Sequence, residues 1–308
     1  MEELIIILII LVCLLFLLIF INKSKFESFN SEFTGSVLIK NGAPTNNFIP
    51  KIIWSFWNDE DIPGIVKACI NSWKKYNPGY QIVIINENNV NQYLPDINIH
   101  SQKNLSDSWP RISDVIRLNL LKKYGGFWID SSMICNKSLQ WILDIQQKNK
   151  VECIAYYFEG FTDNELLHSS PVIESWFICA VTNSNFIKEW CDEFMSINNY
   201  SSVDDYLKTT VDNGTSLQKI DIPNYLAIHV AAQKILQKPN NFNLFLMNAI
   251  KGPYFYHYDN VPNGGTWDIK RDVDILLTGK YKNISLIKLR GGERNYIIDN
   301  NLNYDKMF

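Results

Sequence analysis

The chain has 308 residues, of which 46% are hydrophobic, so it can form one large α/β domain or two small ones with a sizeable core. The formal net charge of −3 gives no reason to expect a nucleic acid as partner. The six cysteines show no Cys-x-x-Cys metal spacing, which favours buried free thiols.

The chain opens with an unbroken apolar run of 18 residues, at positions 4–21. At about 1.5 Å per residue the run nearly spans a hydrocarbon core of roughly 30 Å. A cleavable signal peptide is the alternative, but Glu2 and Glu3 precede the run and no clean small-residue cleavage site follows. We therefore predict a single-pass transmembrane anchor over residues 1–21. Lys23 and Lys25 follow it, which favours a cytoplasmic C-terminal domain.

Residues 22–47 are polar and contain two glycines and a proline, so we predict a stalk there and a folded domain over residues 48–308. A β-rich run at 49–57, an apolar helical stripe at 63–76 and a second strand at 80–86 predict a parallel βαβ unit. This is the pattern of a Rossmann-like nucleotide-binding half. Neither Gly-x-Gly-x-x-Gly nor a Walker A sequence occurs, so neither a dinucleotide cofactor nor a P-loop is indicated.

Residues 109–132 carry most of the chemistry. A cap at Ser108 or Asp107, with Pro110 in the first turn, predicts the start of a helix and Gly125 its end, and a short buried strand follows at 127–129. Asp114 and Arg117 are three residues apart and share a helix face. Asp130 stands at the carboxyl end of the strand, where open α/β sheets bind ligands. We expect these three side chains to meet in one crevice.

The rest of the chain continues to alternate between helices and strands. We expect helices at 139–147, 186–195 and 225–237, and strands at 151–158, 171–180 and 283–290. Residues 198–220 are polar, and the pattern at residues 240–250 does not distinguish between a helix and a strand.

The pattern Ser-Asp-x-x-Arg-x-x-x-Leu-x-x-Tyr-Gly-Gly-x-Trp-x-Asp at 113–130 resembles the donor-sugar segment of glycosyltransferases. It is most similar to the GT-A fold type with a DXD motif, of the capsular polysaccharide synthesis and glycosyltransferase family 32 kind. Pro-Lys-Ile-Ile-Trp at 50–54 resembles the first strand of the same families. The resemblance implies a GT-A hexosyltransferase that moves a sugar from a nucleotide-sugar donor to a glycan or polysaccharide acceptor.

The resemblance also implies roles for individual residues. Asp130 opens the DXD motif, which binds a divalent metal, Mn²⁺ or Mg²⁺, on the diphosphate, and His257 is a candidate second ligand. Glu174 is a candidate base or acceptor of a sugar hydroxyl, with a structural carboxylate as the alternative. The implied donor-binding residues are Trp54, Arg111, Asp114, Arg117, Tyr124, Gly125, Gly126, Ser132 and Trp176. For Trp54, a place in the core is an equal alternative, and Trp57 is a second candidate for stacking on a base or sugar.

The chain departs from the DXD motif at its second carboxylate, which is Ser132. A hydroxyl is a weaker metal ligand than a carboxylate. A membrane-tethered binding protein without catalysis is therefore the alternative function. Lys288 and Arg290, near the end of the chain, are candidate phosphate contacts or else solvated cations.

Overall fold

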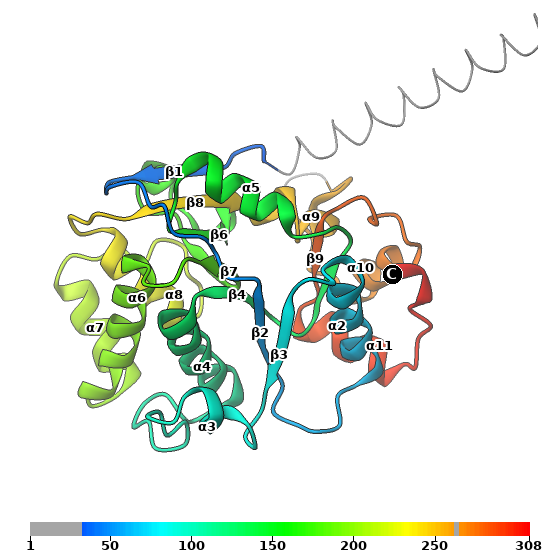
Figure 1. Ribbon diagram of the computed structural model, residues 1–308, viewed down its shortest axis with the longest axis horizontal. Helices are drawn as coiled ribbons and strands as arrows, with labels where there is room; N and C mark the ends of the chain where they lie inside the picture. The colour runs from blue at the N-terminus through cyan, green and yellow to red at the C-terminus, as the bar shows by residue number, and fades with distance from the viewer. Residues whose placement is uncertain (1–32, 262–264) are drawn as a thin grey trace, which may run out of the picture.

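The centre of the molecule is a seven-stranded mixed sheet, seen in a computed structural model that describes residues 33–261 and 265–308 (Figure 1). The strand order is β1-β8-β6-β7-β4-β2-β3. The bounds are β1 Val37–Lys40, β2 Ile52–Phe56, β3 Gln81–Ile85, β4 Gly126–Ile129, β6 Cys153–Tyr157, β7 Ile173–Ala180 and β8 Asn243–Asn248. The predicted anchor at 4–21 lies outside the described residues, and among those described no helix is long and apolar enough to span a bilayer.

The predicted βαβ unit is confirmed. Strands β2 and β3 pair in parallel and are joined by α2 (Gly64–Tyr76), and β4 pairs in parallel on the other side of β2. Strand β7 then runs antiparallel to both of its neighbours, β4 and β6. The carboxyl ends of β2, β3 and β4 therefore lie at the same end of the sheet as the amino end of β7. The polar residues described below lie at this end.

Helices cover both faces of the sheet (Figure 1). One face packs against α4 (Trp109–Tyr124), α6 (Asn185–Met195), α7 (Val203–Asp212) and α8 (Ala227–Leu236). The other packs against α2, α5 (Gln140–Asn149), α10 (Ile269–Leu277) and α11 (Gly291–Asp299), together with a two-stranded sheet of β5 (Met133–Cys135) and β9 (Leu286–Lys288). Short helical turns complete the chain: α3 Val90–Tyr93, α9 Phe255–Tyr258, and 3₁₀ turns at Glu159–Phe161, Asn164–Leu166, Ser196–Asn199, Ala249–Lys251 and Asp305–Met307.

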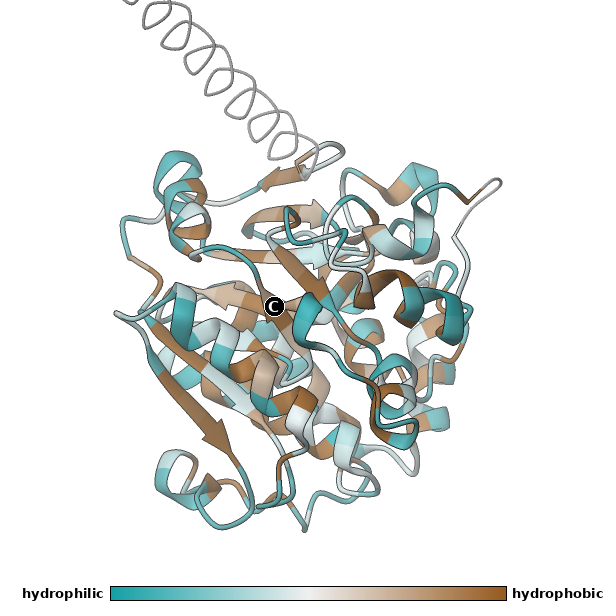
Figure 2. Cartoon of the chain, turned by 90° about the vertical axis from the view of Figure 1, so that its right-hand side faces the viewer, coloured by the Kyte–Doolittle hydropathy of each residue, from teal (hydrophilic) through white to brown (hydrophobic). Residues whose placement is uncertain are grey.

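Strand β4 shows why the fold needs two apolar layers. Trp128 packs into the core on the α4 side, while Phe127 and Ile129 pack into the core on the α2 side. Successive side chains of a strand point to opposite faces, so a strand covered on both faces is apolar throughout. In Figure 2 the strands are largely brown, whereas the helices around them carry both brown and teal segments, as expected for helices with one buried face.

The predicted stalk is wrong at its C-terminal end. Val37–Lys40 forms β1, which pairs antiparallel with β8 at the sheet edge, so the domain begins before the predicted boundary at residue 48. Val37 and Ile39 are buried, and the residues after each of them are exposed, as in a half-buried edge strand. Four residues are too short a pattern to stand out in a polar segment.

Candidate functional site

Two glycines at the end of α4 bring the site residues together. Gly125 has a φ of +65°, and a Cβ there would lie 2.8 Å from the backbone nitrogen of Thr182. Gly126 has a φ of +94°, and its Cβ would lie 2.7 Å from the carbonyl oxygen of Ile52. Only glycine tolerates both the left-handed backbone and this crowding. The Gly-Gly turn therefore lets β4 enter the sheet directly after α4, which brings Asp130 next to the helix.

The predicted trio meets as expected. Arg117 donates through Nη1 to Asp114 Oδ1 at 3.0 Å and through Nη2 to Asp130 Oδ1 at 3.1 Å. Its guanidinium lies over the ring of Trp128, 4.8 Å from the centroid. The Arg117 side chain is only 6% exposed, so a buried guanidinium joins the helix carboxylate to the strand-end carboxylate.

Lys288, at the end of β9, completes this group. Its Nζ lies 3.0 Å from Asp130 Oδ2 and 3.2 Å from Ser132 Oγ. The Ser132 hydroxyl in turn donates to the carbonyl of Leu289 at 2.8 Å. Asp130 Oδ1 also accepts a bond from Trp128 Nε1 at 3.0 Å. Both carboxylate oxygens of Asp130 are thus already bound by the protein's own donors.

These contacts do not fit a divalent ion at Asp130. Such an ion needs several free oxygen ligands, whereas Asp130 is held by two cations and Ser132 by Lys288 and a carbonyl. Among the described residues, the sole group of three or more metal-ligating side chains lies elsewhere and does not include Asp130. The metal at Asp130 stays a prediction from the resemblance.

The two carboxylates titrate differently. Burial raises the pKa of Asp114 to about 6, although the Arg117 guanidinium opposes the rise. Burial also acts to raise the pKa of Asp130, but Lys288 and Arg117 outweigh it and hold that pKa below its ordinary value. At neutral pH Asp130 is the firmly ionised member of the pair.

A cleft of about 590 Å³, a volume typical of small-molecule sites, is lined by Asp114, Arg117, Asp130, Ser132 and Lys288. Phe56 and Trp57, at and just after the end of β2, also line the cleft. Arg290, Gly291 and Arg294, from the amino end of α11, add two more cations and a helix N-terminus. The cleft therefore combines a flat aromatic wall with a basic end, which suits a base or sugar next to a phosphate group.

Glu174 lies where this cleft meets a second groove. Its carboxylate is buried on β7, with Oε2 3.5 Å from Nε2 of His229. Trp176 also lines the cleft, where it stacks on Tyr156 with ring centroids 5.2 Å apart. The second groove, of about 360 Å³, adjoins the cleft and is lined on its own side by Phe158, Phe161, Asp221, Ile222 and Trp267. The lining residues common to both spaces are Glu174, Tyr225, Leu226, His229, Tyr254 and Arg290. A carboxylate between two binding spaces is well placed to act on a group that passes from one to the other.

Several predicted donor-binding residues do not line the cleft. Trp54 is 2% exposed and donates to the carbonyl of Gly125, so it is a core residue, and Trp57 takes the place in the cleft wall. Arg111 is bound to Asn104, Asp107 and Asn224, and its guanidinium holds loops together. Tyr124 donates to the carbonyl of Tyr93 and packs on Trp54. Gly125 and Gly126 act through the turn alone. These residues support the elements that carry the site but do not line the cleft.

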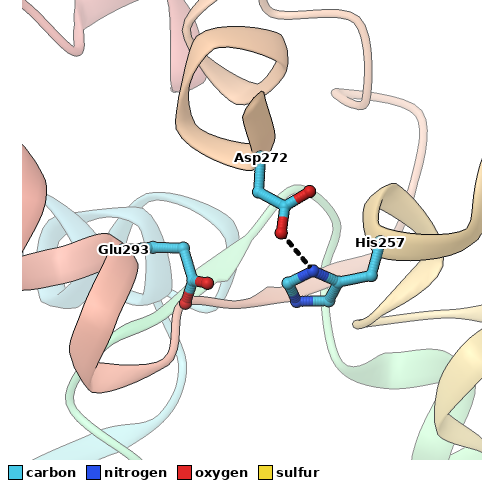
Figure 3. Close-up of side chains that lie close together, drawn as sticks. All are labelled: His257, Asp272 and Glu293. Atoms are coloured by element: carbon cyan, nitrogen blue, oxygen red, sulfur yellow. Dashed lines mark hydrogen bonds and ion pairs between the residues drawn. The ribbon is translucent and has the colours of Figure 1, made fainter. Parts of the chain in front are cut away.

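His257 is not brought to Asp130. It is fully buried with Asp272 and Glu293, and its Nδ1 lies 2.6 Å from Asp272 Oδ2 (Figure 3). Arg271 and Arg290 neutralise the two carboxylates, so a cation entering this cluster would have to displace a guanidinium. Burial, aided by Arg290, lowers the pKa of His257 to about 2. The cluster holds Arg290 at the cleft.

Sequence reasoning missed part of the site. Lys288 and Arg290 were expected only as possible phosphate contacts, and Arg294, Tyr225 and Tyr254 were not expected at all. Glu293 accepts the backbone N–H of Arg290 and so caps the start of α11. The sequence carries no N-cap signal for this start, because the arginine side chain has no hydrogen-bond acceptor.

Residues 23–247 match the model of a protein family described as "Capsular polysaccharide synthesis protein". A curated relative, inositol phosphoceramide mannosyltransferase 3 of Schizosaccharomyces pombe, is 30% identical over 102 residues, which are 31% of this chain and 27% of the relative. The chain thus matches about a quarter of that relative's length.

Three solved structures show a loose likeness. PaToxG glycosyltransferase is 16% identical with a TM-score of 0.39, and the match covers 70% of this chain and 77% of that one. An active-site mutant of LgtC is 12% identical with a TM-score of 0.40, covering 82% and 96%. The WbbM bifunctional enzyme is 14% identical with a TM-score of 0.42, covering 82% and 48%.

Proposed function

The chain belongs to the capsular polysaccharide synthesis family, which confirms that resemblance, and we propose that it is a GT-A type glycosyltransferase. It moves a hexosyl group from a nucleotide-sugar donor to a glycan or polysaccharide acceptor. The observation that carries this proposal is the cleft at the carboxyl ends of β2 and β4, where Asp114, Arg117 and Asp130 meet a basic end. Ligands of open α/β sheets bind at this position.

The cleft supplies what the reaction requires. Glycosyl transfer leaves a nucleotide diphosphate, and cations fixed in a partly dry site stabilise the charge that develops on it. Lys288, Arg290 and Arg294 stand at the basic end for this purpose. Asp114, and Asp130 through Oδ2, can accept hydrogen bonds from donor hydroxyls, since each carboxylate oxygen has two lone pairs and Oδ2 of Asp130 is bound by Lys288. The aromatic ring of Trp57 offers a surface for a base or sugar.

The second groove is the proposed acceptor site. Ile222 and Tyr225 line it and are each 57% exposed, which is unusual for large apolar side chains next to a cleft. Glu174 stands between donor and acceptor spaces and is the proposed base or hydroxyl acceptor. Because the curated relative is named a mannosyltransferase, a mannosyl donor is the first to try. We also propose that residues 4–21 anchor the enzyme in a membrane with the domain on the cytoplasmic side.

The test uses the purified full chain, incubated with a panel of UDP- and GDP-sugars while nucleotide release is followed. We expect release from at least one donor, and a fall of about 100-fold or more in Asp114→Asn, because a donor hydroxyl loses its charged acceptor. Asp144→Asn, on the exposed surface of α5, is the matched control and should release nucleotide at the wild-type rate.

Two other outcomes are informative. If no nucleotide sugar is hydrolysed and none raises the melting temperature, the donor-site assignment is contradicted. Stabilisation by a nucleotide sugar, without release even when glycan acceptors are added, would favour the binding protein without catalysis.

A further inference from the structure

The structure places a fixed ammonium group where a DXD motif would hold a metal ion. The Nζ of Lys288 contacts both the carboxylate of Asp130 and the hydroxyl of Ser132, the first and last residues of the motif. We propose that Lys288 is the resident cation of the donor site, so that this chain binds and releases a nucleoside diphosphate without a divalent metal. This inference rests on the proposed function.

Neighbouring contacts hold Lys288 in this position. In the sheet of β5 and β9, Lys288 pairs with Met133, the residue that follows Ser132. The backbone of Lys288 is fixed on both sides, since its N–H donates to Pro253 O at 3.1 Å and its carbonyl accepts from Tyr256 Oη at 2.7 Å. Its side chain is 10% exposed. The ammonium is thus held by the fold, unlike a surface lysine that meets the site by chance.

The substitution of Ser132 for a carboxylate agrees with this assignment. A second aspartate would give the site two carboxylates, which a doubly charged ion balances. One carboxylate and one hydroxyl need less positive charge, and Lys288 together with Arg117 already supplies two cations to Asp130. An added divalent ion would be repelled by both at short range. The ammonium can give three hydrogen bonds, and because two of them go to Asp130 and Ser132, one donor proton is left for a phosphate oxygen.

Other parts of the cleft extend the positive charge along the path of a diphosphate. The guanidinium of Arg290 lies 4.4 Å from the ring centroid of Trp267, and that of Arg294 lies 5.2 Å from the ring centroid of Trp57. Arg290 is further fixed by Glu293, which binds its guanidinium and caps α11. The amino end of α11 adds the positive end of a helix dipole. Two phosphates can therefore be met by groups that the chain itself provides.

The experiment compares the unaltered full chain in EDTA and in Mn²⁺. We expect UDP or GDP affinity, measured by calorimetry, and nucleotide release to change by less than about twofold between the two conditions. We also expect Mn²⁺ titrated alone, followed by electron paramagnetic resonance, to show no tight site. Lys288→Met should weaken nucleotide affinity by about tenfold or more in EDTA, since a charged hydrogen bond is lost.

Lys288→Arg keeps the cation and should retain more affinity than Lys288→Met, whereas Lys122→Met, at an exposed ion pair, should match wild type. Thermal unfolding checks that each variant is folded, and if Lys288→Met is not, the EDTA comparison on the unaltered chain still decides. Nucleotide binding or release that requires Mn²⁺ would overturn the inference and leave the glycosyltransferase proposal standing. Metal-independent binding of UDP or GDP without any sugar transfer would support Lys288 and contradict the proposed function.

Discussion

Arg117 provides the strongest test of how the site is held together. It is the buried cation that joins Asp114 on α4 to Asp130 after β4, at 3.0 and 3.1 Å. Arg117→Met keeps an apolar stem against Trp128 but leaves Asp114 buried without a charged partner. Removing one member of a buried pair costs about 3–5 kcal/mol, and Asp130 keeps Lys288, so we expect the lower end, about 3 kcal/mol.

The assay is thermal unfolding followed by tryptophan fluorescence, with Trp128 directly below the altered side chain. For domains of this size 1 kcal/mol shifts Tm by roughly 2–4 °C, so we expect a fall of roughly 6–12 °C at pH 8. The fall in Tm should be smaller near pH 5, where the Asp114 carboxyl is protonated in the wild type. Loss of Arg117 then leaves no unpaired buried charge. The control is Lys122→Met, whose ion pair with Asp192 has side chains 38% and 51% exposed, and it should cost under about 1 kcal/mol. Equal shifts for the two variants would refute the reasoning.

The other predictions concern pH dependence, the turn and the acceptor groove. Folding raises the pKa of Asp114 to about 6. The stability that this group contributes is therefore present below its unfolded pKa and is lost as pH rises from about 4 to 6. By linkage, the loss in the free energy of unfolding is roughly 3 kcal/mol. Tm measured against pH should therefore be flatter in that window for Asp114→Asn, and parallel curves would contradict the burial argument. Gly125→Ala should cost more stability in urea unfolding than Gly214→Ala, because both have positive φ but a Cβ clashes only at Gly125; each strained residue costs about 1–3 kcal/mol. Ile222→Ser should raise KM for the acceptor and leave KM for the donor unchanged. A change in donor KM alone would contradict the assignment of the acceptor site to this groove.

Local patterns in the sequence predicted the central βαβ unit and the chemistry of its edge. The helix 109–124 was predicted from Ser108, Pro110, its apolar stripe and Gly125, and each of these signals is local. The structure begins and ends the helix at these positions, although the Ser108 side chain makes no capping hydrogen bond. The spacing of Asp114, Arg117 and Asp130 then follows from a helix of known rise and a strand that starts at once. This stretch also carried the resemblance to the capsular polysaccharide synthesis family, which the match of residues 23–247 to the family model confirms.

The tertiary structure decided which predicted residues face the ligand. Trp54 and Trp57 are three residues apart on and just after β2, yet one is in the core and the other in the cleft, because strand direction and helix packing choose the face. Arg111 and Arg117 lie on one helix, but the loop before the helix and a distant loop, through Asn224, bind the first, whereas the second binds Asp130 in the site.

Lys288 shows the limit most clearly. It contacts Asp130 and Ser132 across more than 150 residues of sequence, through the pairing of β5 with β9. No local pattern encodes such a contact, because it depends on where two distant short strands meet. The sequence by itself determined that a carboxylate and a hydroxyl stand at the end of β4, and only the folded chain determined that a lysine is the cation between them.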